Sequence, residues 1–182
     1  FIAGHNGMVG KSLVNFFRKK KFGKLILASR KELNLETSNK VEKFIKNKKP
    51  NIIINCAAYT TVDKAEEEQN LANQVNHLAV KQLAQIAKNQ QAKLIHISTD
   101  YVFDGESDKP YTETDETNPI NIYGKTKLAG EQALKEIMPT DAIVIRTSWV
   151  YSEYGNNFVK TMLRIGKQRD ELSVVGDQIG SP

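Results

Sequence analysis

The sequence is poor in cysteine and has no long apolar run. Cys56 is the only cysteine in 182 residues, so the chain contains no internal disulfide framework and no cysteine-rich metal site. No apolar stretch approaches the roughly 20 residues that a membrane-spanning helix needs. These shortages exclude disulfide scaffolds and membrane bundles, and a single thiol fits a reducing compartment, so we expect a cytoplasmic protein without a membrane partner.

The charge of the chain is positive, with a formal net value of +5. Most basic residues are lysines scattered along the sequence, and they do not alternate with aromatic residues as they do on a base-stacking surface. The basic run 18–21 lies at the end of a predicted helix, where cations suit the helix dipole. We therefore expect a solvated lysine-rich surface and no nucleic-acid partner.

Hydrophobic periodicity predicts strands that alternate with helices along the whole chain. The predicted strands are 1–3, 25–28, 52–57, 93–97, 142–146 and 172–175; the predicted helices are 8–20, 38–48, 63–89, 121–138 and 157–168, and a long polar loop covers 99–119. Such alternation favours an α/β fold of the Rossmann type, a doubly wound parallel sheet with helices on both faces. Ligands of such sheets bind at the carboxyl ends of the strands.

Three glycines, Gly4, Gly7 and Gly10, follow the first predicted strand and open the first predicted helix. Glycines at this place allow a tight turn and a close approach of the backbone to a pyrophosphate, which the helix N-terminus attracts. A purely structural turn is the alternative interpretation. The position of the glycines between strand and helix favours dinucleotide binding.

The end of the second predicted strand bears on the choice between NADPH and NADH. An NAD site usually has an acidic residue about 20 positions after the glycines, but here the strand ends in Ser29 and Arg30. A guanidinium suits a 2′-phosphate, which favours NADPH. A surface cation without this role is the other interpretation, so both cofactors stay open.

A candidate catalytic set follows the fourth predicted strand. Tyr123 and Lys127 are spaced i, i+4 on a predicted helix and therefore share one face. A neighbouring ammonium lowers the pKa of a tyrosine, so Tyr123 is a candidate general acid. Thr99, just past the strand, is placed to donate a hydrogen bond to a substrate carbonyl.

Longer motifs carry a family resemblance. They are 55–66 (NCAAYTTVDKAE), 97–105 (ISTDYVFDG), 123–131 (YGKTKLAGE), 146–151 (RTSWVY), 155–158 (GNNF) and 177–182 (DQIGSP). With these motifs the chain resembles the extended short-chain dehydrogenases/reductases, and among them the dTDP-4-dehydrorhamnose reductases. The resemblance implies an NAD(P)H-dependent oxidoreductase that reduces the C4 keto group of dTDP-4-dehydro-L-rhamnose, in the synthesis of surface polysaccharide.

The resemblance also implies roles for single residues. Tyr123 would protonate the C4 oxygen, Lys127 would hold the nicotinamide ribose, and Thr99 would bind the same oxygen. Besides Tyr123 and Lys127, the implied cofactor residues are Gly4, Gly7, Met8, Val9, Gly10, Ser29, Arg30, Asn34, Leu35, Ala57, Ala58 and Tyr59. The implied substrate residues, with Thr99, are Val62, Asp63, Tyr101 and Trp149.

The resemblance further implies how the chain is divided. Residues 1–176 would form the NAD(P)-binding domain with the catalytic residues, and 177–182 would begin a smaller C-terminal substrate domain. We expect the first strand to begin before Phe1 and most of the substrate domain to follow Pro182. The histidines show no metal-ligand spacing, so no metal ligands are predicted. A Mg²⁺ ion and a homodimer stay open.

Two alternatives to simple reduction remain. Residues 1–10 look more like GDP-fucose synthases, which are epimerase-reductases of the same group, but Asp100 stands where their cysteine falls, which disfavours epimerisation. The second alternative is a non-catalytic NADP-binding module that resembles the regulatory subunit of methionine adenosyltransferase. That subunit keeps the Tyr-x-x-x-Lys pair, so the pair does not separate the two functions.

Overall fold

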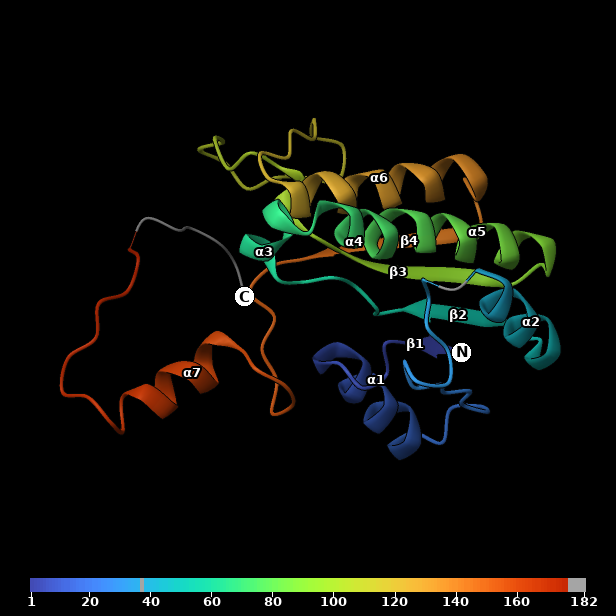
Figure 1. Cartoon of the computed structure of the whole chain (residues 1–182), viewed down its shortest axis with the longest axis horizontal. Helices are drawn as coiled ribbons and strands as arrows, with labels where there is room; N and C mark the ends of the chain where they lie inside the picture. The colour runs from blue at the N-terminus through green and yellow to red at the C-terminus, as the bar shows by residue number, and fades with distance from the viewer. Residues whose placement is uncertain (37, 177–182) are drawn as a thin grey trace.

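The structure is a computed structural model, and it describes residues 1–36 and 38–176. The predicted start of the substrate domain at 177–182 lies outside the described residues. Within the described part, four strands form one sheet in the order β1-β2-β3-β4 (Figure 1). They are β1 (Ile2–Ala3), β2 (Ile52–Asn55), β3 (Lys93–Thr99) and β4 (Ala142–Thr147), and every pair is parallel. The predicted α/β class is confirmed.

The strand order of the sheet changes direction at β1, which has neighbours on both of its edges. Ile2 pairs with Ile54 of β2 and also forms a single parallel bridge with Leu27. A strand residue pairs with neighbours on its two opposite edges, so Leu27 and β2 flank β1. A reversal of this kind is the topological switch point at which doubly wound sheets bind ligands. The glycine turn follows β1 directly.

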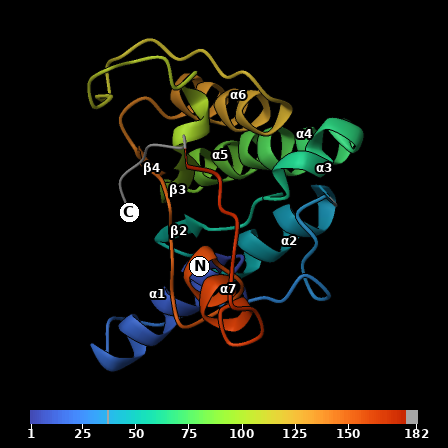
Figure 2. The same ribbon diagram turned by 90° about the vertical axis from the view of Figure 1, so that its left-hand side faces the viewer.

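Helices cover both faces of the sheet (Figures 1 and 2). They are α1 (Met8–Lys19), α2 (Ser38–Lys48), α3 (Val62–Glu67), α4 (Gln69–Asn73), the π-helix η1 (Gln74–Leu78), α5 (Ala79–Asn89), the 3₁₀ turn η2 (Asp100–Val102), α6 (Ile122–Ile137) and α7 (Phe158–Ile165). Helices α5 and α6 lie on one face and contact β3, whereas α1 lies on the other. Among the described helices, none is both long and apolar enough to cross a membrane.

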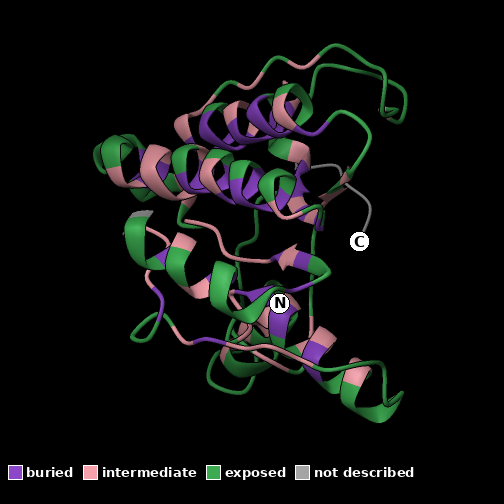
Figure 3. Ribbon diagram, turned by 90° about the vertical axis from the view of Figure 1, so that its right-hand side faces the viewer, coloured by how far each residue is buried: buried purple, intermediate pink, exposed green. Residues whose placement is uncertain are grey.

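The main core lies between the sheet and the α5–α6 face. Leu83 of α5, Leu94 of β3 and Leu134 of α6 are almost completely buried there. Figure 3 shows the buried residues gathered along the inward surfaces of these helices. This packing fixes α6 against β3, and the candidate catalytic residues are on these two elements.

The prediction is wrong for two of the six strands, 25–28 and 172–175. Residues 25–28 form only the bridge at Leu27, because β1 offers just two residues for pairing. Residues 172–175 have no regular structure and pair with no described strand; Val174 and Val175 are exposed. Apolar β-branched residues favour a strand, but an extended segment becomes one only where a neighbour takes its backbone hydrogen bonds.

Candidate functional site

The glycine turn is packed so tightly that side chains are excluded from two of its positions. Gly4 has φ +71°, and a Cβ on it would lie 2.6 Å from the backbone nitrogen of Ala57. A Cβ on Gly10 would lie 2.3 Å from the Gly4 carbonyl oxygen. Gly7 is the N-cap of α1, and the first turn of this helix, which Met8 and Val9 begin, contains no acidic residue. An anionic group therefore fits the N-terminus of α1, where the sequence predicts a pyrophosphate cradle.

The loop after β2 is held by two buried asparagines. The Asn55 side chain accepts a hydrogen bond from the Ala57 backbone nitrogen (3.1 Å). Asn76, in η1, accepts from the Tyr59 nitrogen (2.9 Å) and donates to the Tyr59 carbonyl (3.1 Å). Ala57, Ala58 and Tyr59, which are predicted to line the cofactor, thus run from the glycine turn toward α3.

The end of β3 places Thr99 beside the start of α6. The Thr99 hydroxyl donates to the Asp100 carboxylate (3.1 Å) and accepts from the Tyr101 nitrogen (3.2 Å), so it caps η2. The Tyr101 ring meets the Tyr123 ring edge to face, with centroids 5.6 Å apart. A Cβ on Gly124 would lie 2.1 Å from the Tyr101 carbonyl oxygen, so glycine is what allows α6 to approach η2 this closely.

Tyr123 lies in the first turn of α6 and is 8% exposed. Burial raises the pKa of its phenol; a hydrogen bond with the Thr99 side chain acts in the opposite direction, and the nearby Asp100 carboxylate raises the pKa further. The expectation that Lys127 lowers this pKa is wrong here, because the Lys127 ammonium is not among the groups that perturb Tyr123. The phenol is therefore kept protonated, as a proton donor must be.

Lys127 is buried one helical turn further along α6. Its Nζ donates to the Ile97 carbonyl oxygen (2.7 Å) and lies 3.4 Å from Nε2 of His96. Burial lowers the pKa of Lys127 to about 8, whereas the nearby Glu131 and Cys56 act to raise it. Burial also raises the pKa of the Cys56 thiol to about 11, which keeps the thiol protonated and unreactive.

A partly buried ion pair between Arg146 and Glu131 stabilises this region. Glu131 of α6 receives two hydrogen bonds from Arg146 Nε and one from Arg146 Nη2 (2.8 Å), and the Ser98 hydroxyl also donates to it. The Arg146 guanidinium lies over the Phe103 ring, 4.9 Å from its centroid. The cluster ties β3, α6 and β4 together next to Thr99.

The cofactor residues predicted between Ser29 and Leu35 form a separate cluster. Arg30 makes an ion pair with Glu36 (2.6 Å), and its side chain is 75% exposed. Asn34 accepts a hydrogen bond from the Glu36 nitrogen (3.1 Å), and Leu35 packs against the core. Ser29 donates to Glu32 through its backbone nitrogen (2.8 Å) and its hydroxyl (2.7 Å). The guanidinium predicted to meet a 2′-phosphate is thus paired with a carboxylate of its own chain.

The predicted substrate residues are only partly brought together. Val62 packs in the small cluster that contains Tyr123, and Asp63 is exposed in the first turn of α3. Trp149 follows β4 with φ +50°, is 42% exposed, and meets the Phe158 ring edge to face. No described contact joins Trp149 to Tyr123.

The segment after β4 packs on the glycine turn and α1, which the sequence did not predict. The Ser152 and Ser12 hydroxyls are hydrogen-bonded (3.0 Å), and Asn157 donates to the Met8 sulfur (3.6 Å). A Cβ on Gly155 would lie 3.3 Å from the Met8 Cβ. This contact brings the start of α7 next to the predicted pyrophosphate cradle.

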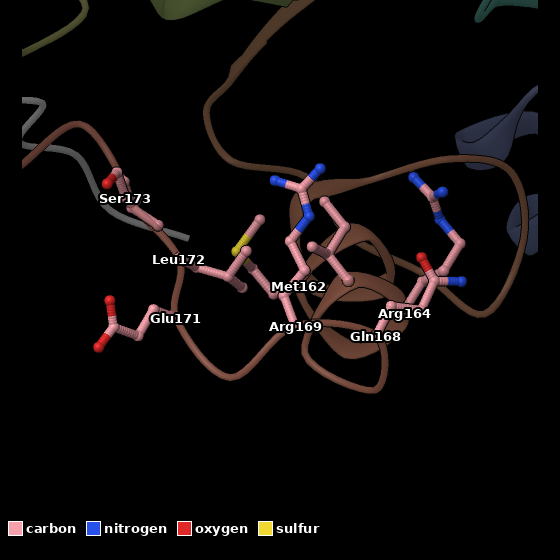
Figure 4. Close-up of a pocket in the computed structure, with 9 residues that line it drawn as sticks. Met162, Arg164, Gln168, Arg169, Glu171, Leu172 and Ser173 are labelled. Atoms are coloured by element: carbon pink, nitrogen blue, oxygen red, sulfur yellow. The ribbon is translucent and has the colours of Figure 1, made fainter.

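A hollow of about 960 Å³ lies elsewhere, between α7 and the segment that follows it (Figure 4). Its lining includes Met162, Arg164, Arg169 and Leu172, and none of the predicted site residues. The chemistry-bearing groups converge instead at the carboxyl ends of β1, β2 and β3. Among the described residues, no His, Cys, Asp and Glu side chains group as a metal site.

Sequence reasoning missed the polar residues behind the site. Asn55, His96 and Glu131 are at most 7% exposed. His96 contacts both Asn55 and Lys127. Glu131 accepts a hydrogen bond from Ser98 near the end of β3. The available signal was a polar residue inside an apolar strand, since His96 stands between Ile95 and Ile97. Burial of such a residue requires partners, but its partners are distant in sequence.

Comparisons with known proteins show the family of the chain. The family model described as RmlD substrate binding domain matches residues 1–182. A dTDP-4-dehydrorhamnose reductase of Aggregatibacter actinomycetemcomitans is 45% identical over 181 residues, which are 100% of this chain and 61% of the relative. Crystal structures of a dTDP-4-dehydrorhamnose reductase from Clostridium acetobutylicum (47% identity) and of one from Bacillus anthracis in complex with NADP (45%) both give a TM-score of 0.95.

Each of these two structures is matched over 100% of this chain and 64% of its own length. The chain therefore spans a little under two thirds of the relatives that it resembles. A family model that matches every residue, together with this level of identity, places the chain in a family: it belongs to the RmlD substrate binding domain family.

Proposed function

We propose that this protein reduces the C4 keto group of dTDP-4-dehydro-L-rhamnose to a hydroxyl, with NADPH as the hydride donor. The observation that carries the proposal is the pairing of two hydroxyls, those of Thr99 and Tyr123, with buried Lys127 one helical turn away. These groups lie at the carboxyl ends of the strands, near the switch point where such sheets bind dinucleotides. The names of the relatives support the same reaction.

The glycine turn supports the cofactor. Gly4 and Gly10 leave no room for a Cβ, and Gly7 exposes the N-terminus of α1 to an anion. The Bacillus anthracis relative, which has the same fold, was crystallised with NADP. Gly4, Gly7, Met8, Val9 and Gly10 would hold the pyrophosphate, and the loop of Ala57, Ala58 and Tyr59 would line the cofactor.

The protein would supply a proton and orient the carbonyl, whereas the bound cofactor supplies the hydride. The Tyr123 phenol, kept protonated by burial, donates its proton to the C4 oxygen as negative charge develops there. The Thr99 hydroxyl donates a hydrogen bond to the same oxygen and stabilises that charge. The Lys127 ammonium would hold the ribose of the cofactor.

The sugar nucleotide would lie over the carboxyl ends of the strands. Val62, Asp63, Tyr101 and Trp149 are the candidate contacts, and of these Tyr101 and Val62 already pack beside Tyr123. Nucleoside diphosphates carry the negative charge that a helix N-terminus and a lysine-rich surface tolerate. The single free thiol, Cys56, fits a reducing compartment such as the cytoplasm.

The test is NADPH oxidation in the presence of dTDP-4-dehydro-L-rhamnose. We expect turnover, and we expect Tyr123→Phe to lower kcat by about 10² to 10⁴-fold while NADPH affinity is retained. Tyr151→Phe, at an exposed tyrosine, is the matched control. Tight cofactor binding without any turnover would instead favour the non-catalytic binding module.

The NADPH preference has a test of its own. The Arg30 guanidinium is engaged by Glu36, so Glu36→Gln should free it for a 2′-phosphate and lower the KM for NADPH a few-fold, with little effect on NADH. Arg30→Ala should raise the KM for NADPH. A preference for NADH that neither variant changes would exclude this role of Arg30.

A further inference from the structure

A line of three buried polar side chains runs beneath the candidate site. It begins at Asn55 at the end of β2, passes through His96 in the middle of β3 and ends at Lys127 on α6. The three residues are 1%, 0% and 1% exposed, respectively. Because none of them reaches water, their donors and acceptors must match one another.

The orientation of the Asn55 amide is assigned by its other partner. Its oxygen accepts a hydrogen bond from the Ala57 backbone nitrogen (3.1 Å), so its NH₂ group is the part that faces His96 Nδ1, also at 3.1 Å. An amide NH₂ group only donates. His96 Nδ1 must therefore be an acceptor, which means that it carries no proton.

The far side of the imidazole ring follows from this. A neutral imidazole with an unprotonated Nδ1 carries its proton on Nε2. Burial and the nearby Lys127 hold the pKa of His96 well below its usual value, which disfavours the imidazolium. The group that faces Lys127 Nζ at 3.4 Å is therefore an N–H donor.

Two charge states of Lys127 respond differently to this donor. An ammonium has only donors, so it cannot bond to the His96 Nε2–H, whereas the lone pair of a neutral amine accepts from it. The distances agree with a mismatch for the ammonium: Nζ lies 2.7 Å from the Ile97 carbonyl oxygen, an acceptor, but 3.4 Å from Nε2.

We propose that His96, oriented by Asn55, is a positioning residue that presents an N–H to Lys127 Nζ and favours its neutral amine over its ammonium. For catalysis the inference rests on the proposed function, in which Lys127 acts as an ammonium: the Asn55–His96 pair then sets the upper end of the pH range in which Tyr123 and Lys127 work together. His96 touches neither the cofactor nor the substrate in this scheme.

The other ionisable groups around Lys127 do not provide this effect. The Cys56 thiol, which follows β2, and Glu131, on α6, both favour the ammonium, and the Glu131 oxygens are occupied by Ser98 and Arg146. Tyr123, on the same helix, is a buried neutral phenol. Besides desolvation of Lys127 itself, the His96 N–H is the described feature that opposes the ammonium.

The tautomer is the first measurement. In the ¹⁵N-histidine-labelled protein we expect the Nδ1 shift of an unprotonated nitrogen and the Nε2 shift of a protonated one between pH 6 and 9. Asn55→Asp places a carboxylate opposite His96 Nδ1. The imidazole proton should therefore move from Nε2 to Nδ1, and Nε2 should become an acceptor. A wild-type His96 with its proton on Nδ1 would overturn the proposal.

The second measurement is the titration of Lys127, followed by ¹³C NMR of labelled lysine Cε. His96→Gln keeps a neutral polar side chain but lets its amide oxygen turn toward the ammonium, so the Lys127 midpoint should rise by about one unit, a tenfold gain in proton affinity. Asn55→Asp should raise it as well. Ile95→Val, one residue away on β3, is the control and should leave the midpoint unchanged.

The outcomes separate this inference from the proposed function, because neither NMR measurement needs turnover. If His96→Gln does not move the titration midpoint of Lys127, burial alone acts on Lys127. If the midpoint rises in Asn55→Asp while His96 keeps its proton on Nε2, the added charge alone acts on Lys127. Either outcome would overturn the inference. If turnover is present, the alkaline limb of kcat should move upward with the midpoint in His96→Gln. A shifted midpoint in a protein without turnover supports the inference and rejects the reductase.

Discussion

Helices α6 and α7 are both amphipathic, yet only one of them is built into the core. Helix α6 buries apolar residues such as Leu134 and polar ones such as Lys127 and Glu131, and it contacts β3, β4 and α5. Helix α7 buries none of its residues, and its Leu163 is 64% exposed. The pattern along a helix shows that one face is meant to be covered, but the tertiary structure decides whether anything covers it.

The comparison also teaches where chemistry can be placed. A buried lysine keeps a perturbed pKa only where rigid neighbours hold it away from water, and α6 has such neighbours whereas α7 has not. Exposed arginines of α7, such as Arg164, keep their hydration. Variants at matched positions on the two helices test this difference.

The largest difference between the two helices is expected when one cation of each, Lys127 of α6 and Arg164 of α7, is replaced by methionine. Lys127→Met should lower kcat by at least about 100-fold, because it removes the ammonium that holds the cofactor ribose in the proposed function. The thermal unfolding midpoint should be unchanged or higher, since the desolvation of a buried charge is removed. Arg164→Met on α7 should leave kcat within about twofold. Steady-state kinetics and calorimetry check both variants, and full activity of Lys127→Met would remove Lys127 from the site.

Truncation of a leucine gives the next largest difference. Leu134→Ala should lower the free energy of unfolding by about 2–5 kcal/mol, because it leaves a cavity between α6 and the sheet. Leu163→Ala on α7 should change it by no more than about 0.5 kcal/mol. Urea unfolding measures both values. Equal losses would mean that α7 is packed in solution as firmly as α6.

Added methyl groups give a smaller difference. A Cβ on Gly130 of α6 would lie 2.3 Å from the Asn76 carbonyl oxygen, so Gly130→Ala should cost about 1–3 kcal/mol through a forced shift of η1. Gly166, at the C-terminus of α7, has its nearest neighbour at 3.1 Å, and its φ of −63° suits alanine. Gly166→Ala should therefore change the unfolding free energy by under about 0.5 kcal/mol.

The smallest effects are expected at the N-caps. Asn121 accepts from the Gly124 nitrogen (2.7 Å) and Asn157 from the Lys160 nitrogen (3.1 Å). Asn121→Ala should lower global stability by about 1 kcal/mol. Asn157→Ala should instead reduce amide protection in α7 alone, because a helix without buried residues opens locally. Hydrogen exchange distinguishes global from local loss, and a global loss in Asn157→Ala would argue against independent opening of α7.

Much of the fold followed from periodicity. The strands at 52–55, 93–99 and 142–147 and the helices α1, α2 and α6 lie within two residues of their predicted positions, because their apolar faces are long and regular. Residues 25–28 and 172–175 have the same β-branched and apolar character but no ladder. Their own composition contains no information about whether a partner strand is long enough or present.

The candidate site also has features that local sequence predicts and features that it does not. The spacing of Tyr123 and Lys127 was enough to place both on one face of α6, since i, i+4 neighbours on a helix must share a face. The glycine turn was equally local. The partners that give these residues their properties were not: Lys127 meets His96 from 31 positions away, and Tyr123 meets Thr99 from another element.

By itself the sequence determined the α/β alternation, the glycine turn after β1 and the Tyr-x-x-x-Lys pair on α6, because each is set by contacts between residues near in the chain. Only the tertiary structure decided that Arg30 is paired with Glu36, that Tyr123 is kept protonated by burial rather than ionised by Lys127, and that Asn55 fixes the tautomer of His96. These properties depend on desolvation and on hydrogen bonds between elements, and both exist only once the sheet and its helices have packed.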